Sequence, residues 1–260
     1  MFVPFINGRV EGPPPGYPLV IELQSTPQAC LQCRVRKTSL CNAIPEHQLA
    51  HLSGTVMHGI AMPGHDLITQ GDAAESFFNV SSGTAKLYKT MPNGRRQITG
   101  FVGHGQFLGL AVSEYYAFSA EAIDRVTYCR FSRPWLRALM GEFPQIERHL
   151  LAIVSNELLV AQDQMLLLGQ KSALEKVASF LVMWSRQGAS GQTVQSRFQL
   201  PMSRGDIADY LGMKIETVSR SFTVLRDKKV IETTGHHHVS IIKYRALLKI
   251  ADGEGAIQDM

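Results

Sequence analysis

Apolar and polar positions follow a β-type rhythm over the middle of the chain. From about Gly59 to Arg133, short β-forming runs alternate with Pro-Gly, Gly-Asp, Ser-Gly and Asn-Gly turn signals. The turn signals recur at intervals of roughly ten residues, which is typical of a sandwich or jelly-roll barrel. Asn93 and Gly94 form the clearest hairpin turn, because this pair favours the backbone twist of a tight connection. The pattern predicts a β-roll sensory domain over residues 51–140.

After Pro134 the apolar period becomes helical and remains so to about Lys171. One apolar stripe alternates spacings of three and four residues, as in a heptad seam, and a second, weaker stripe lies beside it. The two stripes predict a dimerisation helix over residues 141–171, with one stripe against the barrel and one against a partner helix. A single buried helix in a monomer is the alternative. The candidate positions for the dimer contact are Leu151, Val154, Leu158, Leu159, Met165 and Leu166.

Residues 172–249 mix helical and β-type patterns. Within them, residues 201–226 predict two short helices around a tight turn, with Ser203 as N-cap, Asp206 three positions on, and Gly212 at the break. A hairpin that contains three adjacent histidines follows. Helices followed by a two-stranded wing predict a winged helix-turn-helix domain, and residues 250–260 are expected to form a tail. Adjacent histidines on an extended hairpin cannot all point to one metal, so we expect no metal site there.

The outward face of the second short helix carries groups that can read bases. Glu216 and Arg220 lie one helical turn apart, opposite an apolar face. A carboxylate accepts a hydrogen bond from cytosine N4, and a guanidinium binds guanine O6 and N7. The alternative is an ordinary surface ion pair between the two side chains. The candidates for contact with the DNA backbone are Lys214, Thr217, Lys228 and Lys229.

Charge is concentrated at the same end of the chain. The net charge is +4, but the stretch Lys171–Lys249 holds 13 Lys and Arg against 6 Asp and Glu, or +7, which leaves −3 elsewhere. A basic C-terminal region is expected if it meets the phosphates of double-stranded DNA. No apolar run approaches the ~20 residues that cross a bilayer, and the first residues lack a signal peptide pattern. We therefore expect a cytoplasmic protein without membrane contact.

The N-terminal region has a different composition. Residues 1–25 are rich in proline and predict a flexible tail, and residues 26–50 form a cysteine-rich segment. Cys30, Cys33 and Cys41 lie there among basic residues, which favour the thiolate form. In a reducing compartment the four cysteines of the chain are ligands or bystanders rather than a disulfide framework.

Three stretches identify a family resemblance: QITGFVGHGQFLG, DQMLLLGQKSALEKVASFL and SRGDIADYLGMKIETVSRSF. With the predicted order of elements, they resemble the Crp/Fnr superfamily of bacterial transcription regulators, in particular its FnrN/FixK-like branch. The resemblance implies an α+β fold with an N-terminal double-stranded β-helix, a jelly-roll barrel like those that bind cyclic nucleotides. A long dimerisation helix and a C-terminal winged helix-turn-helix would follow. It also implies a homodimer, with the hairpin at Asn93 and Gly94 touching RNA polymerase.

The resemblance also assigns roles on the reading helix. Glu216, Ser219 and Arg220 match the Glu-x-x-Ser-Arg pattern of the Fnr branch, and Ile215 replaces the arginine of the cyclic-AMP-responsive branch. This implies a TTGAT-N4-ATCAA type of site. Arg220 would read guanine, Glu216 the opposite cytosine, and Ser219 a neighbouring base or phosphate.

The four cysteines are the candidate site for sensing a signal. The Fnr branch binds an oxygen-labile [4Fe-4S] cluster, and its ligand pattern is matched by Cys30, Cys33 and Cys41 in C-x2-C-x7-C spacing, with Cys129 as the fourth. The x7 gap resembles the FnrN-like subgroup. Zinc is the rival, although all-cysteine zinc sites usually contain two C-x2-C pairs, and unliganded thiols are a further alternative.

Two other classes of function are disfavoured. Cyclic-nucleotide sensors of the superfamily hold the phosphate with Gly-Glu and Arg-Ser pairs, but here Gly109 precedes Leu110 and Ala111, and no arginine follows before Arg125. A buried phosphate would lack a counter-charge, so we expect no cyclic nucleotide. No nucleophile–base pair or phosphate loop indicates an enzyme. The sequence predicts an oxygen-responsive regulator, mainly an activator of anaerobic or microaerobic genes, or else a DNA-binding regulator gated by another signal.

Overall fold

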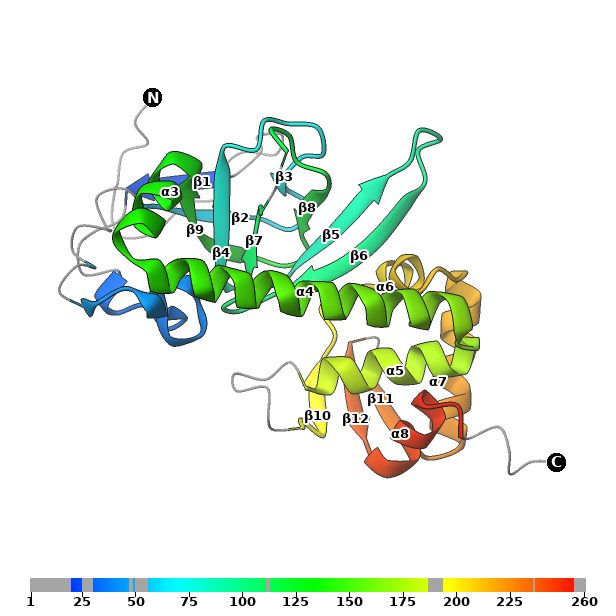
Figure 1. The fold of residues 1–260 in the computed structure, drawn as a ribbon. Helices are drawn as coiled ribbons and strands as arrows, with labels where there is room; N and C mark the ends of the chain where they lie inside the picture. Colours follow the sequence, from blue (N-terminus) through cyan, green and yellow to red (C-terminus); the bar gives the residue numbers. More distant parts are fainter. Residues whose placement is uncertain are drawn as a thin grey trace, which may run out of the picture.

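The computed structural model describes residues 20–24, 30–46, 49, 56–110, 113–186, 194–235 and 237–254. Figure 1 shows a β-rich domain and a mainly helical C-terminal domain, with the long helix α4 (Pro144–Gln170) running along both. The order of barrel, long helix and C-terminal domain is the one that the apolar pattern predicts.

The barrel consists of two sheets whose strand pairs are antiparallel. Apolar side chains from both sheets, among them Val80, Ala120 and Tyr128, form one core between them. The predicted β-roll is therefore confirmed. In order of pairing, the five-stranded sheet contains β1 (Val20–Gln24), β2 (Met57–Ala61), β9 (Val126–Ser132), β4 (Ser76–Ser82) and β7 (Phe107–Leu108), and the four-stranded sheet contains β3 (Asp66–Ile68), β8 (Ser119–Ala122), β5 (Ala85–Thr90) and β6 (Arg96–Val102).

The hairpin at Asn93 and Gly94 joins β5 to β6 as predicted. Gly94 has a φ of 79°, which favours glycine, and the backbone N–H of Arg95 donates to Asn93 Oδ1 at 3.1 Å. Local turn chemistry is sufficient to place this connection.

The predicted N-terminal tail is wrong for its last residues. Val20–Gln24 forms β1, which pairs with β2 from Val20 opposite Ala61 to Gln24 opposite Met57. The stretch VIEL contains β-branched residues that favour strands, and it covers a strand edge that would otherwise be unpaired. The expectation for residues 1–19 lies outside the described part of the chain.

The chain becomes helical at the end of β9. Helix α3 (Arg133–Glu142) has Pro134 in its first turn, and α4 begins one residue after Phe143 with another proline. Leu136 and Leu139 of α3 pack with Ile146 of α4. The boundary between barrel and long helix thus lies at Phe143, close to the predicted one.

The middle of α4 is exposed on both predicted stripes. The six candidate dimer positions are between 49% and 71% exposed. The expectation that one stripe packs on the barrel is therefore wrong, and so is the alternative of a single buried helix. The helix contacts its own chain near its ends, through Ile146 and Leu150 on one side and Leu167 on the other.

By length and composition alone, α4 could also cross a membrane, contrary to the expectation from the sequence. Only 11% of its apolar window is buried within this chain. Both ends of the helix pack on folded domains, through Leu150 and Leu167. The exposed middle is a contiguous apolar surface of the kind that marks an interaction site.

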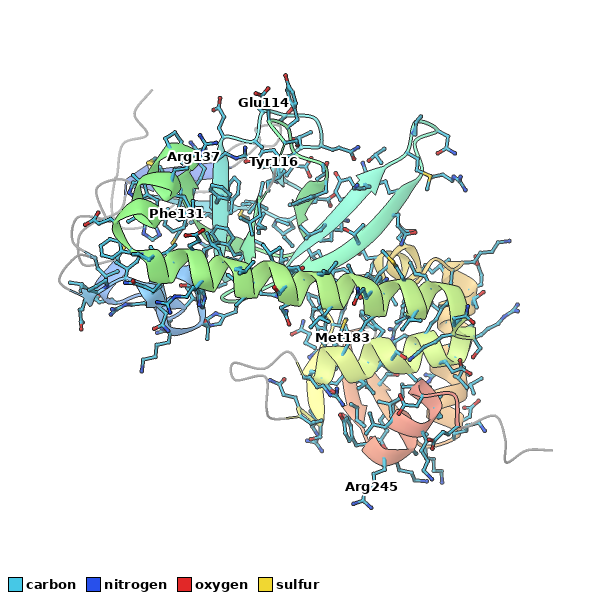
Figure 2. The ribbon with its side chains drawn as sticks, in the orientation of Figure 1. Glu114, Tyr116, Phe131, Arg137, Met183 and Arg245 are labelled. Atoms are coloured by element: carbon cyan, nitrogen blue, oxygen red, sulfur yellow. The ribbon has the colours of Figure 1, made fainter. Side chains whose placement is uncertain are left out.

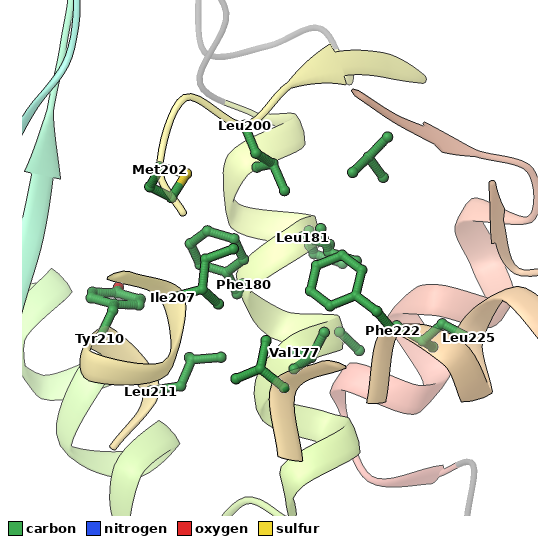
Figure 3. Close-up of a cluster of buried hydrophobic side chains, with 14 of the residues drawn as sticks. Val177, Phe180, Leu181, Leu200, Met202, Ile207, Tyr210, Leu211, Phe222 and Leu225 are labelled. Atoms are coloured by element: carbon green, nitrogen blue, oxygen red, sulfur yellow. The ribbon is translucent and has the colours of Figure 1, made fainter. Parts of the chain in front are cut away.

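The C-terminal domain is the predicted winged helix-turn-helix. Its core is formed by buried side chains such as Phe180, Leu211 and Phe222, which gather around one centre in Figure 3. Helix α8 was not predicted and extends the domain two residues beyond 249. The elements are α5 (Ala173–Ser185), β10 (Arg197–Gln199), α6 (Arg204–Leu211), α7 (Ile215–Asp227), β11 (Ile231–Thr234), β12 (His238–Ile241) and α8 (Tyr244–Ala251), with the sheet in the order β10-β12-β11.

Candidate functional site

The outer face of the five-stranded sheet carries the first half of the site. Side chains alternate between the two faces of a strand, so Tyr128 of β9 fills the barrel while Cys129 and Phe131 face outward. The Phe131 ring stacks on Trp135 of α3 at 5.1 Å between centroids, and Figure 2 shows Phe131 on that side of the barrel. Cys129 is buried at the centre of the sheet, with 6% of its surface exposed.

The N-terminal segment supplies the second half of the site. Tight turns, including the 3-10 helices η1 (Arg36–Thr38) and η2 (Leu40–Ala43), follow the first cysteine. Cys33 N donates to Cys30 O at 3.4 Å, and Ile44 N donates to Cys41 O at 3.2 Å. All four predicted cysteines line one pocket. Its other lining residues are Leu49, Val56, His58, Asn79 and Phe131.

Burial favours the neutral form of two thiols in the pocket. Burial raises the pKa of Cys41 to about 12; charge on Cys30 and Cys33 adds to the shift, while a Ser39 hydrogen bond and Arg36 oppose it. Burial, followed by charge on the other three cysteines, also raises the pKa of Cys129. At Cys41 the expected thiolate-favouring effect of the basic neighbours is therefore outweighed, because loss of hydration penalises the charged thiolate more.

The cysteine segment is docked on two parts of the molecule. Thr38 packs against Gly105 in the β6–β7 turn, where a Cβ atom would lie 2.5 Å from Thr38 Oγ1. Gln145 Nε2 at the start of α4 donates to Ala43 O at 3.2 Å. Ile44 is buried in the same cluster as Ile146. The segment thereby connects the pocket to both the barrel and the long helix.

The second predicted site is the helix pair α6 and α7, which we call the reading unit. A reciprocal capping box starts α6: Asp206 N donates to Ser203 Oγ at 3.0 Å, and Ser203 N donates to Asp206 Oδ2 at 2.9 Å. Gly212 ends the helix in the left-handed conformation, with a φ of 61°. These features confirm the predicted cap and turn.

Helix α7 presents the predicted reading face. Val218 and Phe222 are buried, whereas Glu216, Ser219 and Arg220 are exposed. Among the described residues, no ion pair joins Glu216 to Arg220, so the alternative of a surface ion pair is not supported. The backbone candidates Lys214, Lys228 and Lys229 are also exposed, and Thr217 is half-buried.

Arg204, at the start of α6, was not predicted. Its guanidinium lies over the Phe222 ring, with Cζ 3.3 Å from the centroid. Its Nη1 is buried without a hydrogen-bond partner, and burial, with a smaller effect of Arg226, lowers its pKa to about 10. The arginine remains charged at neutral pH, so the unit carries a cation beside the reading helix that no motif revealed.

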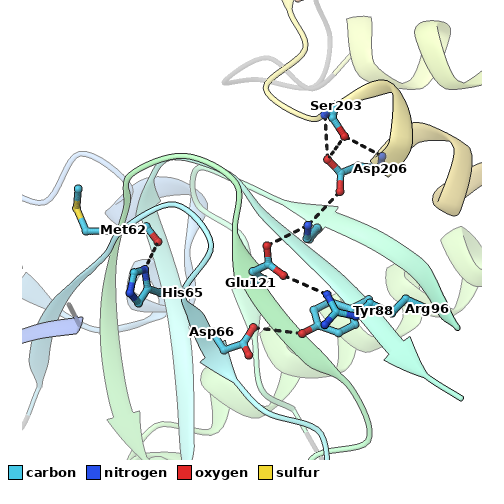
Figure 4. Close-up of polar contacts among 9 residues, drawn as sticks. Met62, His65, Asp66, Tyr88, Arg96, Glu121, Ser203 and Asp206 are labelled. Carbon is cyan, nitrogen blue, oxygen red and sulfur yellow. Dashed lines mark hydrogen bonds and ion pairs between the residues drawn. The ribbon is translucent and has the colours of Figure 1, made fainter. Parts of the chain in front are cut away.

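The hairpin of β5 and β6 contacts the reading unit. Lys86 Nζ lies 3.0 Å from both Glu121 and Asp206, and Figure 4 shows these contacts continuing to the Ser203 cap. Gln97 Nε2 donates to the Asp209 carbonyl. The Phe101 ring packs on Phe180, Trp184 and Tyr210 at 5.3 to 6.2 Å between centroids. The barrel and the C-terminal domain therefore share an interface.

The wing carries no grouped histidine site among its described residues. His237 Nδ1 contacts the Leu200 carbonyl at 2.8 Å, and His238 belongs to β12, paired with Thr234. His236 lies outside the described residues.

Comparisons with known proteins agree with this architecture. A family model described as a Crp-like helix-turn-helix domain matches residues 175–250, and one described as a cyclic nucleotide-binding domain matches residues 61–143. The solved structure of FixK2 from Bradyrhizobium japonicum matches with a TM-score of 0.70 and 32% identity, covering 75% of this chain and 96% of that one.

Curated relatives match over most of their length. Nitrogen fixation regulation protein FixK of Bradyrhizobium diazoefficiens is 39% identical over 80% of this chain and 88% of that protein. Transcriptional activatory protein AadR of Rhodopseudomonas palustris is 43% identical over 76% of this chain and 83% of that protein. Transcriptional activator protein FnrL of Cereibacter sphaeroides is 32% identical over 88% of this chain and 94% of that protein. The chain therefore belongs to the Crp/Fnr family of DNA-binding transcription regulators, on its Fnr branch.

Proposed function

We propose that this protein is a cytoplasmic, oxygen-responsive transcription activator in which Cys30, Cys33, Cys41 and Cys129 hold one [4Fe-4S] cluster per subunit. The observation that carries the proposal is that these four cysteines, three from the N-terminal segment and one from β9, line a single pocket. Four thiolates are the number that such a cluster requires. When bound, the cluster would supply an oxygen-labile link between the segment and the sheet.

The grouping of the donor atoms is our reason to prefer a cluster to a single zinc ion. Among the described residues, no three His, Cys, Asp or Glu side chains are grouped closely enough to share one metal ion. Four thiolates on one zinc would stand about 3.8 Å apart, given tetrahedral bonds of about 2.3 Å. A four-iron cluster binds each thiolate through a different iron, so the sulfur atoms are farther apart. Apolar walls at Leu49, Val56 and Phe131 limit solvent access, on which cluster stability depends.

The position of the segment suggests how cluster loss would reach the DNA. The segment contacts the start of α4 through Ala43 and Ile44, and it contacts the β6–β7 turn through Thr38. With the cluster in place, these contacts hold the N-terminal part of α4 in position. The exposed apolar stripes of α4 then pair with a second copy of the chain. Without the cluster, the segment loosens and the homodimer weakens.

The homodimer would read a TTGAT-N4-ATCAA type of site with its two α7 helices about one DNA turn apart. Arg220 binds guanine, Glu216 accepts from the opposite cytosine, and Ser219 contacts a neighbouring base or phosphate. The hairpin at Asn93 and Gly94 is our candidate contact with RNA polymerase. It projects from the barrel at the far end of β5 and β6 (Figure 1).

We further propose that the barrel binds no cyclic nucleotide, although a cyclic nucleotide-binding family model matches its fold. No arginine lies between Gly109 and Arg125 to meet a phosphate. The residues that fill the barrel, such as Val102 and Val126, are mainly apolar. A buried phosphate would therefore remain without a counter-charge.

Anaerobic purification tests the cluster. The expected product is brown, contains about four iron and four sulfide per chain, and binds the palindromic site more tightly before air exposure than after it. A colourless protein with zinc, or with intact DNA binding in both conditions, would overturn the proposal. Titration with cyclic AMP, monitored by calorimetry, should show no binding.

A further inference from the structure

Cys129 stands between two polar side chains in the five-stranded sheet. In the antiparallel register, its partner on β2 is His58 and its partner on β4 is Asn79. Directly opposed residues on neighbouring antiparallel strands present their side chains on the same face. All three side chains therefore face the cysteine segment, and all three line the pocket. They form a row with the cysteine at its centre.

Asn79 has a polar atom that the protein itself does not satisfy. The residue is 2% exposed, and its Oδ1 is buried without a hydrogen-bond partner. Buried polar groups are nearly always paired, because an unpaired group loses its hydration without compensation. The two ends of a carboxamide exchange by rotation, so the same side chain can present its N–H2 group to the pocket. A buried amide on the wall of a four-thiol pocket points to a partner inside the pocket.

His58 approaches the same cysteine from the other side. Its Nδ1 lies 3.5 Å from Cys129 Sγ, within hydrogen-bond distance for sulfur. An imidazole with its proton on Nδ1 donates to a thiolate in this arrangement. Cys129 is thus flanked by two side chains that can each donate an N–H hydrogen bond.

We propose that Asn79 and His58 are positioning residues that donate hydrogen bonds to the Cys129 thiolate or to an adjacent cluster sulfur. This inference rests on the proposed function, because it presumes a cluster in the pocket. Donors to sulfur withdraw electron density from iron, which stabilises the more negatively charged reduced cluster and makes oxidation harder. The pair would thereby raise the reduction potential of the cluster and lengthen its lifetime in air.

Asn79→Leu tests the inference, because it removes the amide at nearly constant size. The variant should still acquire iron anaerobically, but its reduction potential should become more negative and its colour should bleach in air on the order of tenfold faster. Leucine removes the unpaired buried amide oxygen, so the thermal stability of the cluster-free protein should not fall. A lower cluster-free stability with an unchanged potential and lifetime would indicate a merely structural role and overturn the assignment.

His58 offers a matched pair of variants. His58→Leu should repeat the effects of Asn79→Leu, whereas His58→Asn keeps an amide N–H near the position of Nδ1 and should recover most of the wild-type lifetime. His65→Leu changes a histidine whose Nδ1 contacts the Met62 carbonyl, outside the pocket, and should behave as wild type. If the wild-type protein holds no cluster, both proposals fail. If it does, and both leucine variants keep its potential and lifetime, only this inference fails.

Discussion

The reading unit of α6 and α7 closes over its own core, whereas the cysteine pocket is closed by two segments that lie far apart in the chain. In the reading unit, the helix cap is paired reciprocally and Ile207 and Phe222 are buried against α5. In the pocket, burial raises thiol pKa values and the Asn79 amide oxygen lacks a partner. The first region is capped and packed as folded, and the one buried unpaired side-chain group among its described residues is Arg204 Nη1, which belongs to a guanidinium stacked on Phe222. The second brings four thiols and a buried amide together around a pocket, which is the arrangement expected of a ligand-binding site.

The largest expected effect concerns the core of the C-terminal domain. Phe180 is fully buried at the centre of the C-terminal domain, so Phe180→Ala should lower the free energy of unfolding by about 3–5 kcal/mol. Denaturant unfolding measures the loss, which should be the same in air and without air. Tyr115→Ala, at a site that is 58% exposed, is the control and should change little. A loss that appears only without air would contradict the independence of this core from the pocket.

The exposed face of α4 gives the next largest effect. Leu158 is 61% exposed in the single chain, and a dimer would bury it in both copies. Leu158→Glu should weaken dimerisation by about 3 kcal/mol, taking about 1.5 kcal/mol for each buried apolar side chain as the lower estimate. Sedimentation of anaerobic protein measures the monomer fraction. Met62→Glu, an exposed apolar site on the barrel, should leave the dimer intact; equal weakening by both variants would argue against α4 as the interface.

Removal of one pocket thiol tests whether the cysteine pocket and the reading unit depend on the cluster to different extents. A cluster that binds the folded state only should stabilise the wild-type protein by about 2.7 kcal/mol, as for a ligand at one hundred times its Kd. In Cys41→Ser this gain, measured as the difference between anaerobic and aerobic unfolding, should vanish together with the iron. The fold of the reading unit should persist in the circular dichroism spectrum. Retention of full iron by the variant would remove Cys41 from the ligand set.

The sequence predicted the features that depend on neighbours along the chain. The Ser203 cap, the Gly212 turn, the Val218 and Phe222 face and the Asn93 hairpin all follow from local spacing or turn chemistry. Strand register, by contrast, joins residues far apart in sequence, so no local pattern places His58 and Asn79 on either side of Cys129. The four cysteines were identified because a family pattern carried the long-range information.

Two errors have the same physical origin. An apolar stripe indicates that a surface should be covered but not what covers it, so the α4 stripes could not show that both are exposed in the described part of the chain. Likewise, the proline-rich composition near the N-terminus concealed the short β1 strand, whose pairing partner lies at Met57–Ala61.

On the reading helix, base contacts and backbone contacts should be separable. Arg220→Ala should cost about 1–3 kcal/mol on the matched site and relax the preference at one base pair, since a bidentate guanine contact is lost. Lys228→Ala should weaken binding to all sequences alike. It should also reduce the slope of the logarithm of the binding constant against the logarithm of the salt concentration by about one. Competition binding at several salt concentrations distinguishes the two. Identical behaviour of both variants would contradict the base-reading role of Arg220.

The smallest effect tests how far the reading unit depends on the barrel. Lys86 bridges Glu121 and Asp206 with 17% of its side chain exposed, and Lys86→Met would leave Asp206 with only its Ser203 contacts. Because the Glu121 carboxylate keeps Arg96 at 3.7 Å, we expect a loss of only about 1 kcal/mol. Thermal unfolding at neutral pH should show the loss. Arg95→Met, which changes an exposed cation on the same hairpin, is the control.

The same variant has a pH signature. Burial alone would raise the pKa of Asp206, but the Ser203 hydrogen bonds and Lys86 outweigh it and hold the pKa below its ordinary value. A lowered folded-state pKa contributes stability that is present above the unfolded value of about 4 and is lost as the pH falls through the folded value. Without Lys86 the folded pKa of Asp206 rises toward the unfolded value, so the stability that Asp206 loses in acid should be smaller than in the wild-type protein and the loss should end at a higher pH. If stability falls with acid in the same way in Lys86→Met and in the wild-type protein, the reading unit holds Asp206 without help from the barrel.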